Sequence, residues 1–237
     1  MAQYVYGKNV VRQILTDATR ARKVWISVND PEIERLCKER HVPLQFTDKK
    51  TITKMAASDK HQGVIAEIVP YQTYTVAELT QGVSGGSNVL VMLDGIEDPH
   101  NLGAILRTCD CVGAAGVIYK KDNAVGLTPA AAKTSAGAID TVKCAEVTNL
   151  VRTCEELKKQ GWWIIGADMA GQDYRSLKYD MNVVLVIGSE GKGISRLLKE
   201  NCDYLVKIPM KGRISSLNAS VSAAVLLYGI DAIRFPL

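Results

Sequence analysis

The chain has 237 residues, of which 47% are hydrophobic and 23% charged, the composition of a globular protein of one or two domains. The longest apolar stretch, at residues 223–227, is far shorter than the ~20 residues that span a bilayer, so we expect no membrane partner. Residues 1–11 contain no apolar segment, so we expect no signal peptide.

The six cysteines form no C-x-x-C pair and no cluster with histidine at zinc-ligand spacing; they stand at positions 37, 109, 111, 144, 154 and 202. The sequence therefore predicts no metal site. Free thiols are typical of a reducing compartment, and we expect the protein in the cytoplasm.

The net charge of +4 is confined to the first part of the chain. Residues 1–70 contain 12 Lys and Arg against 8 Asp and Glu, whereas residues 71–237 contain 17 of each. A basic N-terminal segment fits a surface that binds a polyanion, and it fits a solvated surface without a partner equally well.

Residues 1–75 have the pattern of a small α/β domain. Apolar periodicity and turn residues predict, in chain order, a helix over 9–18, a strand over 24–28, a helix over 32–40 that begins after Pro31, and a strand over 62–68. A Gly/Ser-rich stretch at 81–87 indicates a linker, which we place at residues 76–88.

Residues 89–237 alternate apolar strands with helical stretches. The predicted strands are 89–93, 116–119, 162–167, 183–187 and 204–208, and the predicted helices are 102–112, 129–138, 150–160, 194–200 and 217–230. Continuous apolar strands are typical of a sheet covered on both faces, so we expect an α/β domain with a mostly parallel sheet. In such sheets ligands bind beyond the carboxyl ends of the strands.

The first of three unusual strand-to-helix junctions runs from Leu93 to Thr108. A buried strand ends in an acidic turn, which is followed by Asn101 and, one and a half helical turns later, by Arg107. The alternative interpretation is a helix N-cap for Asn101 and a solvated charge for Arg107.

The second junction, from Val186 to Ser195, has glycines at 188, 191 and 193. Glycine lets a ligand lie directly against the backbone, although a flexible turn would also explain these positions. The spacing is neither G-x-G-x-x-G nor G-x-x-x-x-G-K-[ST], which disfavours a nucleotide-dependent enzyme. Glu190 needs hydrogen-bond partners in so tight a loop.

The third junction runs from Ile208 through a basic loop into a helix rich in Ala and Ser, to Ala224. Small side chains allow a second helix or a ligand to approach closely. Tight packing within one subunit is the alternative interpretation.

Together these junctions resemble the three motifs of the SpoU (TrmH-like) RNA 2′-O-ribose methyltransferases of the SPOUT superfamily. Residues 98–103 with Arg107 resemble motif 1, residues 188–193 motif 2, and residues 208–220 motif 3. Residues 6–11 and 61–64 resemble the family's substrate-binding domain. The two-domain arrangement is similar to that of RlmB-type ribosomal-RNA enzymes.

The resemblance implies a knotted C-terminal domain (a trefoil knot), S-adenosyl-L-methionine as cofactor, RNA as partner and a homodimer whose site is completed across the interface. It implies a cofactor-binding set of Gly188, Glu190, Ile208, Met210, Leu217 and Asn218, and a catalytic set of Asn101, Arg107, Glu190, Ser216 and Asn218. Glu190 and Asn218 are expected to organise the loops, with Asn101 and Ser216 closer to the substrate.

The expected reaction is methylation of a ribose 2′-hydroxyl in structured RNA, with a guanosine of large-subunit (23S) ribosomal RNA as the first candidate. Transfer RNA and a catalytically silent RNA-binding protein are the alternatives. The resemblance leaves two roles open for Arg107, as general base or as a clamp on an RNA phosphate, because a guanidinium is effectively never deprotonated. A serine hydrolase is disfavoured by the absence of G-x-S-x-G.

Overall fold

The computed structural model describes residues 3–16, 20–81 and 88–236, and it divides the chain into two compact units, Met1–Tyr71 and Gln72–Leu237. Within the described part of the chain, no helix combines the length and apolarity needed to cross a membrane.

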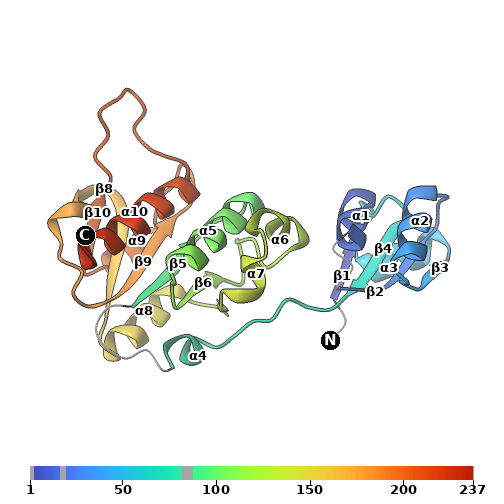
Figure 1. Cartoon of the computed structure of the whole chain (residues 1–237), viewed down its shortest axis with the longest axis horizontal. Coiled ribbons are helices and arrows are strands. Elements are labelled where there is room, and N and C mark those ends of the chain that lie inside the picture. Colours follow the sequence, from blue (N-terminus) through green and yellow to red (C-terminus); the bar gives the residue numbers. More distant parts are fainter. Residues whose placement is uncertain (1–2, 17–19, 82–87, 237) are drawn as a thin grey trace. The chain divides into compact units, whose positions relative to one another are not determined.

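The N-terminal unit is built on a sheet of strand order β1-β4-β2-β3 (Figure 1). β4 pairs antiparallel with β1 and with β2, and β2 pairs parallel with β3. Its elements are β1 (Gln3–Tyr6), α1 (Lys8–Thr16), β2 (Ala21–Ile26), α2 (Pro31–Glu39), β3 (Leu44–Phe46), α3 (Lys49–Ala56) and β4 (Val64–Ile68).

Helices α1 and α2 cover one face of this sheet. Val24 and Ile26 of β2 and Val64 of β4 are buried there against Val11 of α1 and Ile33 of α2. The sequence predicted both helices and the strands β2 and β4. It missed β1 and β3, because strands of three or four residues are too short for a periodic signal, and it missed α3, of which only Ile52 is buried, so that no apolar repeat marks the helix. The predicted end of the first helix, residues 17 and 18, lies outside the described residues.

The C-terminal unit contains a sheet of order β10-β8-β9-β5-β6-β7 in which every pairing is parallel. The expected parallel α/β architecture is confirmed. The elements are α4 (Val76–Thr80), β5 (Val89–Asp94), α5 (Pro99–Cys111), β6 (Gly116–Lys120), α6 (Pro129–Ser135), α7 (Ala138–Thr141), β7 (Cys144–Val147), α8 (Leu150–Lys159), β8 (Trp162–Asp173), the short 3₁₀ helix η1 (Tyr174–Ser176), β9 (Asn182–Gly188), α9 (Arg196–Glu200), β10 (Tyr204–Lys207) and α10 (Ala219–Arg234).

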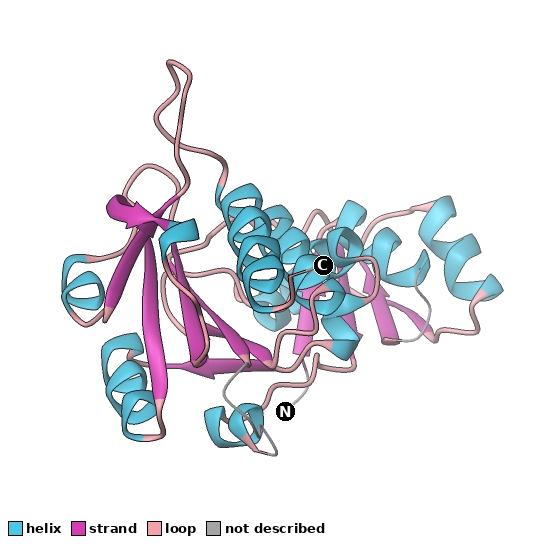
Figure 2. Ribbon diagram, turned by 60° about the vertical axis from the view of Figure 1, so that its left-hand side comes forward, coloured by secondary structure: helices cyan, strands magenta, loops and turns pink. Residues whose placement is uncertain are grey.

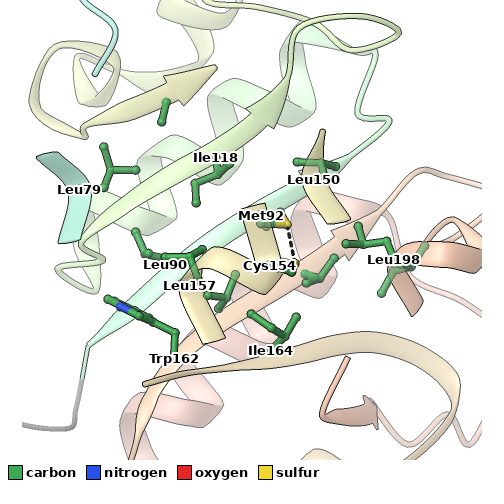
Figure 3. Packing of buried hydrophobic residues seen from close by; sticks show 14 residues of the cluster. Leu79, Leu90, Met92, Ile118, Leu150, Cys154, Leu157, Trp162, Ile164 and Leu198 are labelled. Carbon is green, nitrogen blue, oxygen red and sulfur yellow. Dashed lines mark hydrogen bonds between the residues drawn. The ribbon is translucent and has the colours of Figure 1, made fainter. Parts of the chain in front are cut away.

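Alternate residues of the central strands point to the two faces of the sheet, and both faces are buried. On one face Leu90, Met92 and Val184 pack with Leu157 of α8 and Leu198 of α9 in a continuous core (Figure 3). The intervening strand residues are equally buried toward α5 and α10 on the opposite face, and Figure 2 shows helices on both sides of the twisted sheet. Burial on both faces explains why these strands have unbroken apolar sequences.

Part of the expected linker is folded structure. Residues 76–80 form α4, which Thr75 caps, and Leu79 is buried in the same core as Leu90 and Ile118. Residues 82–87 of that linker lie outside the described residues.

Other differences are local. The helix expected over 129–138 is two helices, α6 and α7, because Ala136 and Gly137 adopt positive φ angles of 52° and 97°. β8 continues six residues beyond the expected end at 167, and β7 was not predicted.

Candidate active site

A cavity of about 570 Å³ lies between the glycine-rich segment that follows β9 and the basic segment that follows β10. Its wall contains seven of the residues that the sequence assigned to a site, namely Gly188, Glu190, Ile208, Met210, Ser216, Leu217 and Asn218. The cavity lies toward the carboxyl ends of β9 and β10, where a parallel sheet is expected to bind its ligand.

A hydrogen-bonded cluster of three polar side chains joins the three junctions. Asn101 Nδ2 donates to Glu190 Oε1 at 3.0 Å, and Asn218 Nδ2 donates to Asn101 Oδ1 at 3.0 Å. Asn218 Nδ2 also donates to Glu190 Oε1. Glu190 therefore has the partners that its position in a tight loop requires, and both come from other segments of the chain.

The N-cap interpretation of Asn101 is wrong. Asp98 caps α5 by accepting from the His100 backbone N–H, and Pro99 occupies the first turn. Asn101 lies within that turn, with 8% of its surface exposed. The asparagine of the cluster that does cap a helix is Asn218. Its Oδ1 accepts from the backbone N–H groups of Ser220 and Val221 at the start of α10. Asn218 thus fixes the start of α10 with its oxygen and joins the cluster with its nitrogen.

The loop after β9 is held tightly to the rest of the sheet. Ser189 and Gly193 exchange two backbone hydrogen bonds, of 3.1 and 2.9 Å, and Asp94 Oδ2 accepts from Ser195 N at 2.7 Å. A Cβ on Gly188 would lie 2.1 Å from the carbonyl carbon of Gly193 and 2.3 Å from Ile194 N. Glycine at 188 is therefore required by contact between two backbone segments, in addition to any contact with a ligand.

The segment between β10 and α10 is a long loop that extends from the sheet (Figures 1 and 2). Its residues 211–218 are all exposed, and Ser215, Ser216 and Leu217 line the cavity. Lys211 and Arg213 place positive charge on this loop beside the cavity.

Arg107 is the one predicted site residue that the structure does not bring to this cavity or to the polar cluster. Its side chain is exposed on α5, and it makes no hydrogen bond or ion pair with the described residues. α5 packs against α10.

Sequence reasoning missed the wall of the cavity that β8 supplies. Asp168 and Met169 lie there, and Asp168 Oδ2 forms an ion pair with Lys199 at 2.8 Å. Burial opposes ionisation of Asp168, but hydrogen bonds from Lys199 and from Ala170 N outweigh it and lower the pKa of this carboxyl. The signal in the sequence that could have identified this wall is an acidic residue, Asp168, directly after the apolar run 162–167.

The residues present fit a cationic nucleoside derivative. Apolar side chains of Ile187, Val206 and Leu226 are accompanied by the small residues Ala167 and Ala219, which leave backbone groups accessible. Charges of both signs line the cavity, the carboxylates of Asp168 and Glu190 and the amines of Lys192 and Lys207, so it offers partners to a cationic sulfonium or ammonium group and to a carboxylate group of the same ligand. The described residues include no group of His, Cys, Asp and Glu that is arranged to hold a metal ion.

Comparison with known families agrees with this geometry. The SpoU rRNA methylase family matches residues 88–228, and a family described as RNA 2′-O ribose methyltransferase substrate binding matches residues 4–74. The chain belongs to the SpoU methyltransferase family. This membership confirms the resemblance, the enzyme class and the cofactor: the protein is an RNA methyltransferase that uses S-adenosylmethionine.

Its relatives cover almost the whole chain. YacO of Bacillus subtilis, which is assigned to the TrmH family of tRNA/rRNA methyltransferases, is 42% identical over 98% of this chain and 96% of its own length. A TrmH family relative from Staphylococcus haemolyticus is 41% identical over 95% of this chain and 94% of its own length.

Solved structures share the fold of this SpoU methyltransferase. The SpoU methyltransferase AviRb of Streptomyces viridochromogenes superposes with a TM-score of 0.66 at 22% identity, covering 98% of this chain and 90% of AviRb. An AdoMet-bound rRNA methyltransferase from Sinorhizobium meliloti gives a TM-score of 0.65 at 22% identity, with 99% and 88% covered.

Proposed function

We propose that this SpoU methyltransferase methylates a ribose 2′-hydroxyl in structured RNA, with a guanosine of 23S ribosomal RNA as the first candidate. The observation that carries the proposal is the Asn101–Glu190–Asn218 cluster, which joins all three motif segments at the edge of one cavity. The name of the family that matches residues 4–74 supports ribose 2′-O as the methylated position.

In this proposal Gly188, Ile208, Met210 and Leu217 hold S-adenosylmethionine, with Glu190 and Asn218 fixing the loops around it. The cofactor supplies an activated methyl group. Ser216, which is exposed and lines the cavity, is proposed to lie closer to the RNA and to orient the ribose, whereas the buried Asn101 is proposed to act through its hydrogen bonds to Glu190 and Asn218. Alignment of the hydroxyl oxygen and exclusion of competing water are the main tasks of such a site.

Arg107 is proposed to hold the RNA. A guanidinium keeps its proton at neutral pH, so a clamp on a phosphate beside the reacting ribose suits Arg107 better than the role of general base. Its side chain is exposed and makes no hydrogen bond or ion pair with the described part of the chain, which leaves its donors available to RNA.

We propose a homodimer in which Arg107 serves the cavity of the partner subunit. Val221 and Tyr228 of α10 are 46% and 51% exposed, and Phe235 just beyond the helix is 63% exposed. With Val225 and Ala232 they form one apolar stripe along α10, because their spacing follows the helical repeat. α5 packs against α10, and in this proposal a contact along the stripe brings Arg107 of one subunit to the cavity of the other.

We also propose a trefoil knot in the C-terminal domain, which membership of the family supports. We propose a cytoplasmic location, which the six free thiols support. Transfer RNA is the second candidate substrate, since the Bacillus relative is named for both RNA classes. A catalytically silent protein is disfavoured because the polar cluster is intact.

The test is incubation of the full-length protein with labelled S-adenosylmethionine and total RNA from a strain that lacks the gene. The methylated nucleotide is then mapped by mass spectrometry after nuclease digestion. A 2′-O-methylguanosine in 23S RNA supports the proposal. Label in transfer RNA would show that the second candidate is the substrate. A product methylated on the base would reject the ribose as the methylated group. The absence of label from every RNA would indicate a catalytically silent protein.

A further inference from the structure

The face of the N-terminal sheet opposite to α1 and α2 carries aromatic and polar side chains. Register places Tyr4 and Lys23 on either side of Glu67 of β4, and Tyr6 and Trp25 on either side of Ile65. Trp25 is in turn opposite Gln45 of β3. Residues opposite each other on paired strands point to the same side of a sheet. We call the surface made by Tyr4, Tyr6, Lys23, Trp25 and Gln45 the aromatic face.

The rings of this face are held in fixed positions but remain accessible. Tyr4 and Tyr6 are 38% and 37% exposed on the edge strand β1, and Trp25 is half-buried. The Tyr4 ring meets the Trp25 ring edge to face, with centroids 6.1 Å apart. Trp25 Nε1 donates to Gln45 Oε1 at 3.1 Å, and Lys23 Nζ lies 4.9 Å from the Trp25 ring centroid. Ordered, exposed rings of this kind suit stacking by a flat ligand.

Helix α3 adds positive charge at the border of the aromatic face. It packs against β1 and β4. Its Ile52 and Ile65 of β4 are both buried, and neither belongs to the core that α1 and α2 form, so α3 lies on the side of the sheet that carries the aromatic face. The exposed lysines of α3 are Lys49, Lys50 and Lys54, and the helix contains no acidic residue.

The other charges of the unit include ion-paired residues and exposed ones, such as Lys38 and Arg40 around the end of α2. Lys8 and Arg12, on α1, form ion pairs with Asp30, so they are not freely available. Asp48 is used as the N-cap of α3, and Glu67 is the acidic residue within the sheet rows of the aromatic face. Asp59, which accepts from Thr53 of α3, is a third carboxylate near the face, so Lys23 and the three lysines of α3 outnumber the nearby carboxylates by one, and the small positive balance suits a polyanion.

We propose that the aromatic face binds unpaired bases of the RNA substrate. Tyr4, Tyr6 and Trp25 stack against bases, while Lys23 and the lysines of α3 contact phosphates. Base-paired RNA hides its bases within the helix, so a stacking surface selects a loop, bulge or single-stranded segment. The inference rests on RNA being the substrate, as proposed above. It adds which surface of the protein contacts the RNA and which part of the RNA that surface binds.

The first test measures binding of the full-length protein to a fluorescent oligouridine of about 12 nucleotides and to a duplex of equal length. The double variant Tyr4→Ala/Tyr6→Ala should raise the Kd for the single strand at least about tenfold, equivalent to about 1.4 kcal/mol. Tyr4→Phe/Tyr6→Phe keeps the rings and should bind within about twofold of the wild type. The duplex should be bound more weakly than the single strand and be less sensitive to either change.

The second test separates phosphate contacts from general charge. Lys50→Gln/Lys54→Gln should reduce the salt dependence of single-strand binding by about 0.7 for each lysine that contacts a phosphate. The matched control Lys38→Gln/Arg40→Gln removes two exposed charges around the end of α2 and should leave the salt dependence unchanged.

Ultraviolet cross-linking of the wild-type protein to 4-thiouridine RNA decides the matter even if the alanine variant does not fold. Cross-links at Tyr4, Tyr6 or Trp25 support the inference. Cross-links confined to other segments, or an unchanged Kd in a folded Tyr4→Ala/Tyr6→Ala variant, would overturn it. A self-association that only this variant loses would likewise overturn it, because the face would then bind a second copy.

Failure of the inference is distinguishable from failure of the proposed function. A wild-type product other than 2′-O-methylribose rejects the proposed reaction while oligouridine binding can still follow the predictions above. Conversely, normal ribose methylation with no effect of the tyrosine variants on RNA affinity rejects only the aromatic face.

Discussion

The side-chain amide of Asn101, in the first turn of α5, donates a 3.0 Å hydrogen bond to Glu190 Oε1, in the loop that follows β9. Asn218 reaches both of these side chains from the start of α10. The Glu190 carboxylate therefore ties together three segments that are distant in sequence, and the shape of the cavity depends on it.

Replacing Glu190 should weaken cofactor binding. In Glu190→Ala the two amides lose their charged acceptor, and we expect the Kd for S-adenosylmethionine to rise by at least about tenfold, since hydrogen bonds to charged groups are worth about 1.5–3 kcal/mol. Glu190→Gln keeps the shape and one acceptor oxygen and should lose less. Calorimetric titration checks this, with Glu200→Ala, which removes a surface ion pair with Arg196, as control. Equal affinities for Glu190→Ala and the wild type would show that the cluster does not shape the cavity.

A methyl group at position 188 should displace the neighbouring loop. The added Cβ of Gly188→Ala would lie 2.1 Å from the Gly193 carbonyl carbon, so residues 188–193 must move. We expect at least about tenfold weaker cofactor binding and a loss of about 1–3 kcal/mol of unfolding free energy, as for other overpacked sites. Gly212→Ala, in the exposed loop before α10 with no heavy atom within 4 Å, is the control and should change neither quantity.

Removal of Arg107 should affect turnover and leave cofactor affinity intact. We expect Arg107→Ala to keep less than about a tenth of the wild-type kcat, a loss above ~1.4 kcal/mol, and Arg107→Lys to be poor because an ammonium does not reproduce the planar guanidinium. Radiometric transfer assays at saturating RNA measure this.

Mixed dimers test whether Arg107 acts on the partner's cavity. A random mixture of Arg107→Ala and Glu190→Ala subunits should recover up to about a quarter of wild-type activity, because half of the dimers are mixed and each mixed dimer has one intact site. If Arg107 serves its own subunit, no site is intact and the mixture should stay at the average of the two single variants, all assayed at an S-adenosylmethionine concentration far below the raised Kd of Glu190→Ala.

The C-terminal end of α10 should contribute strongly to stability. Arg234, which is half-buried there, donates from Nε to Tyr179 O at 2.8 Å and from a terminal nitrogen to Met181 O at 2.7 Å. Arg234→Ala leaves these carbonyls without that donor, and we expect a loss of about 2 kcal/mol in urea denaturation. Arg196→Ala, which removes only an exposed i,i+4 ion pair, should cost less than about 0.5 kcal/mol. Similar losses for both variants would contradict the prediction.

Asp30 should make the N-terminal unit sensitive to acid. Burial opposes ionisation of this carboxylate, but Arg12, Lys8 and the Ile33 N–H bind it and lower its pKa below the usual 3.8. A lowered pKa in the folded state stabilises the fold above the unfolded pKa, and this contribution is lost as the pH falls through the folded pKa.

We therefore expect Asp30→Asn to destabilise the unit by about 2 kcal/mol at pH 7, where a buried ion pair is broken, and by progressively less below about pH 3.8. Denaturation series at several pH values measure the difference from the wild type. Glu34→Gln, on the same helix, is the control. A difference for Asp30→Asn that does not change with pH would reject the role of its charge.

Local patterns predicted most elements of the C-terminal sheet, because strands such as β5 and β9 are buried on both faces and are therefore apolar throughout. They did not predict β1 or β3, which are short, nor the break between α6 and α7, which depends on the αL conformation of Ala136. They also misassigned the cap of α5, since Asp98 and Asn101 are both good capping residues and only the position of the first turn distinguishes them.

The sequence by itself determined the family, the parallel α/β class and the segments that supply the site, because periodicity and motif spacing are properties of neighbouring residues. The tertiary structure decided which of those residues meet. β8 precedes β9 in the chain but lies between β9 and β10 in the sheet, and this order brings Asp168 into the wall of the cavity. The meeting of Asn101, Glu190 and Asn218, and the exposure of Arg107 away from its own cavity, likewise depend on how distant segments pack, which no local pattern encodes.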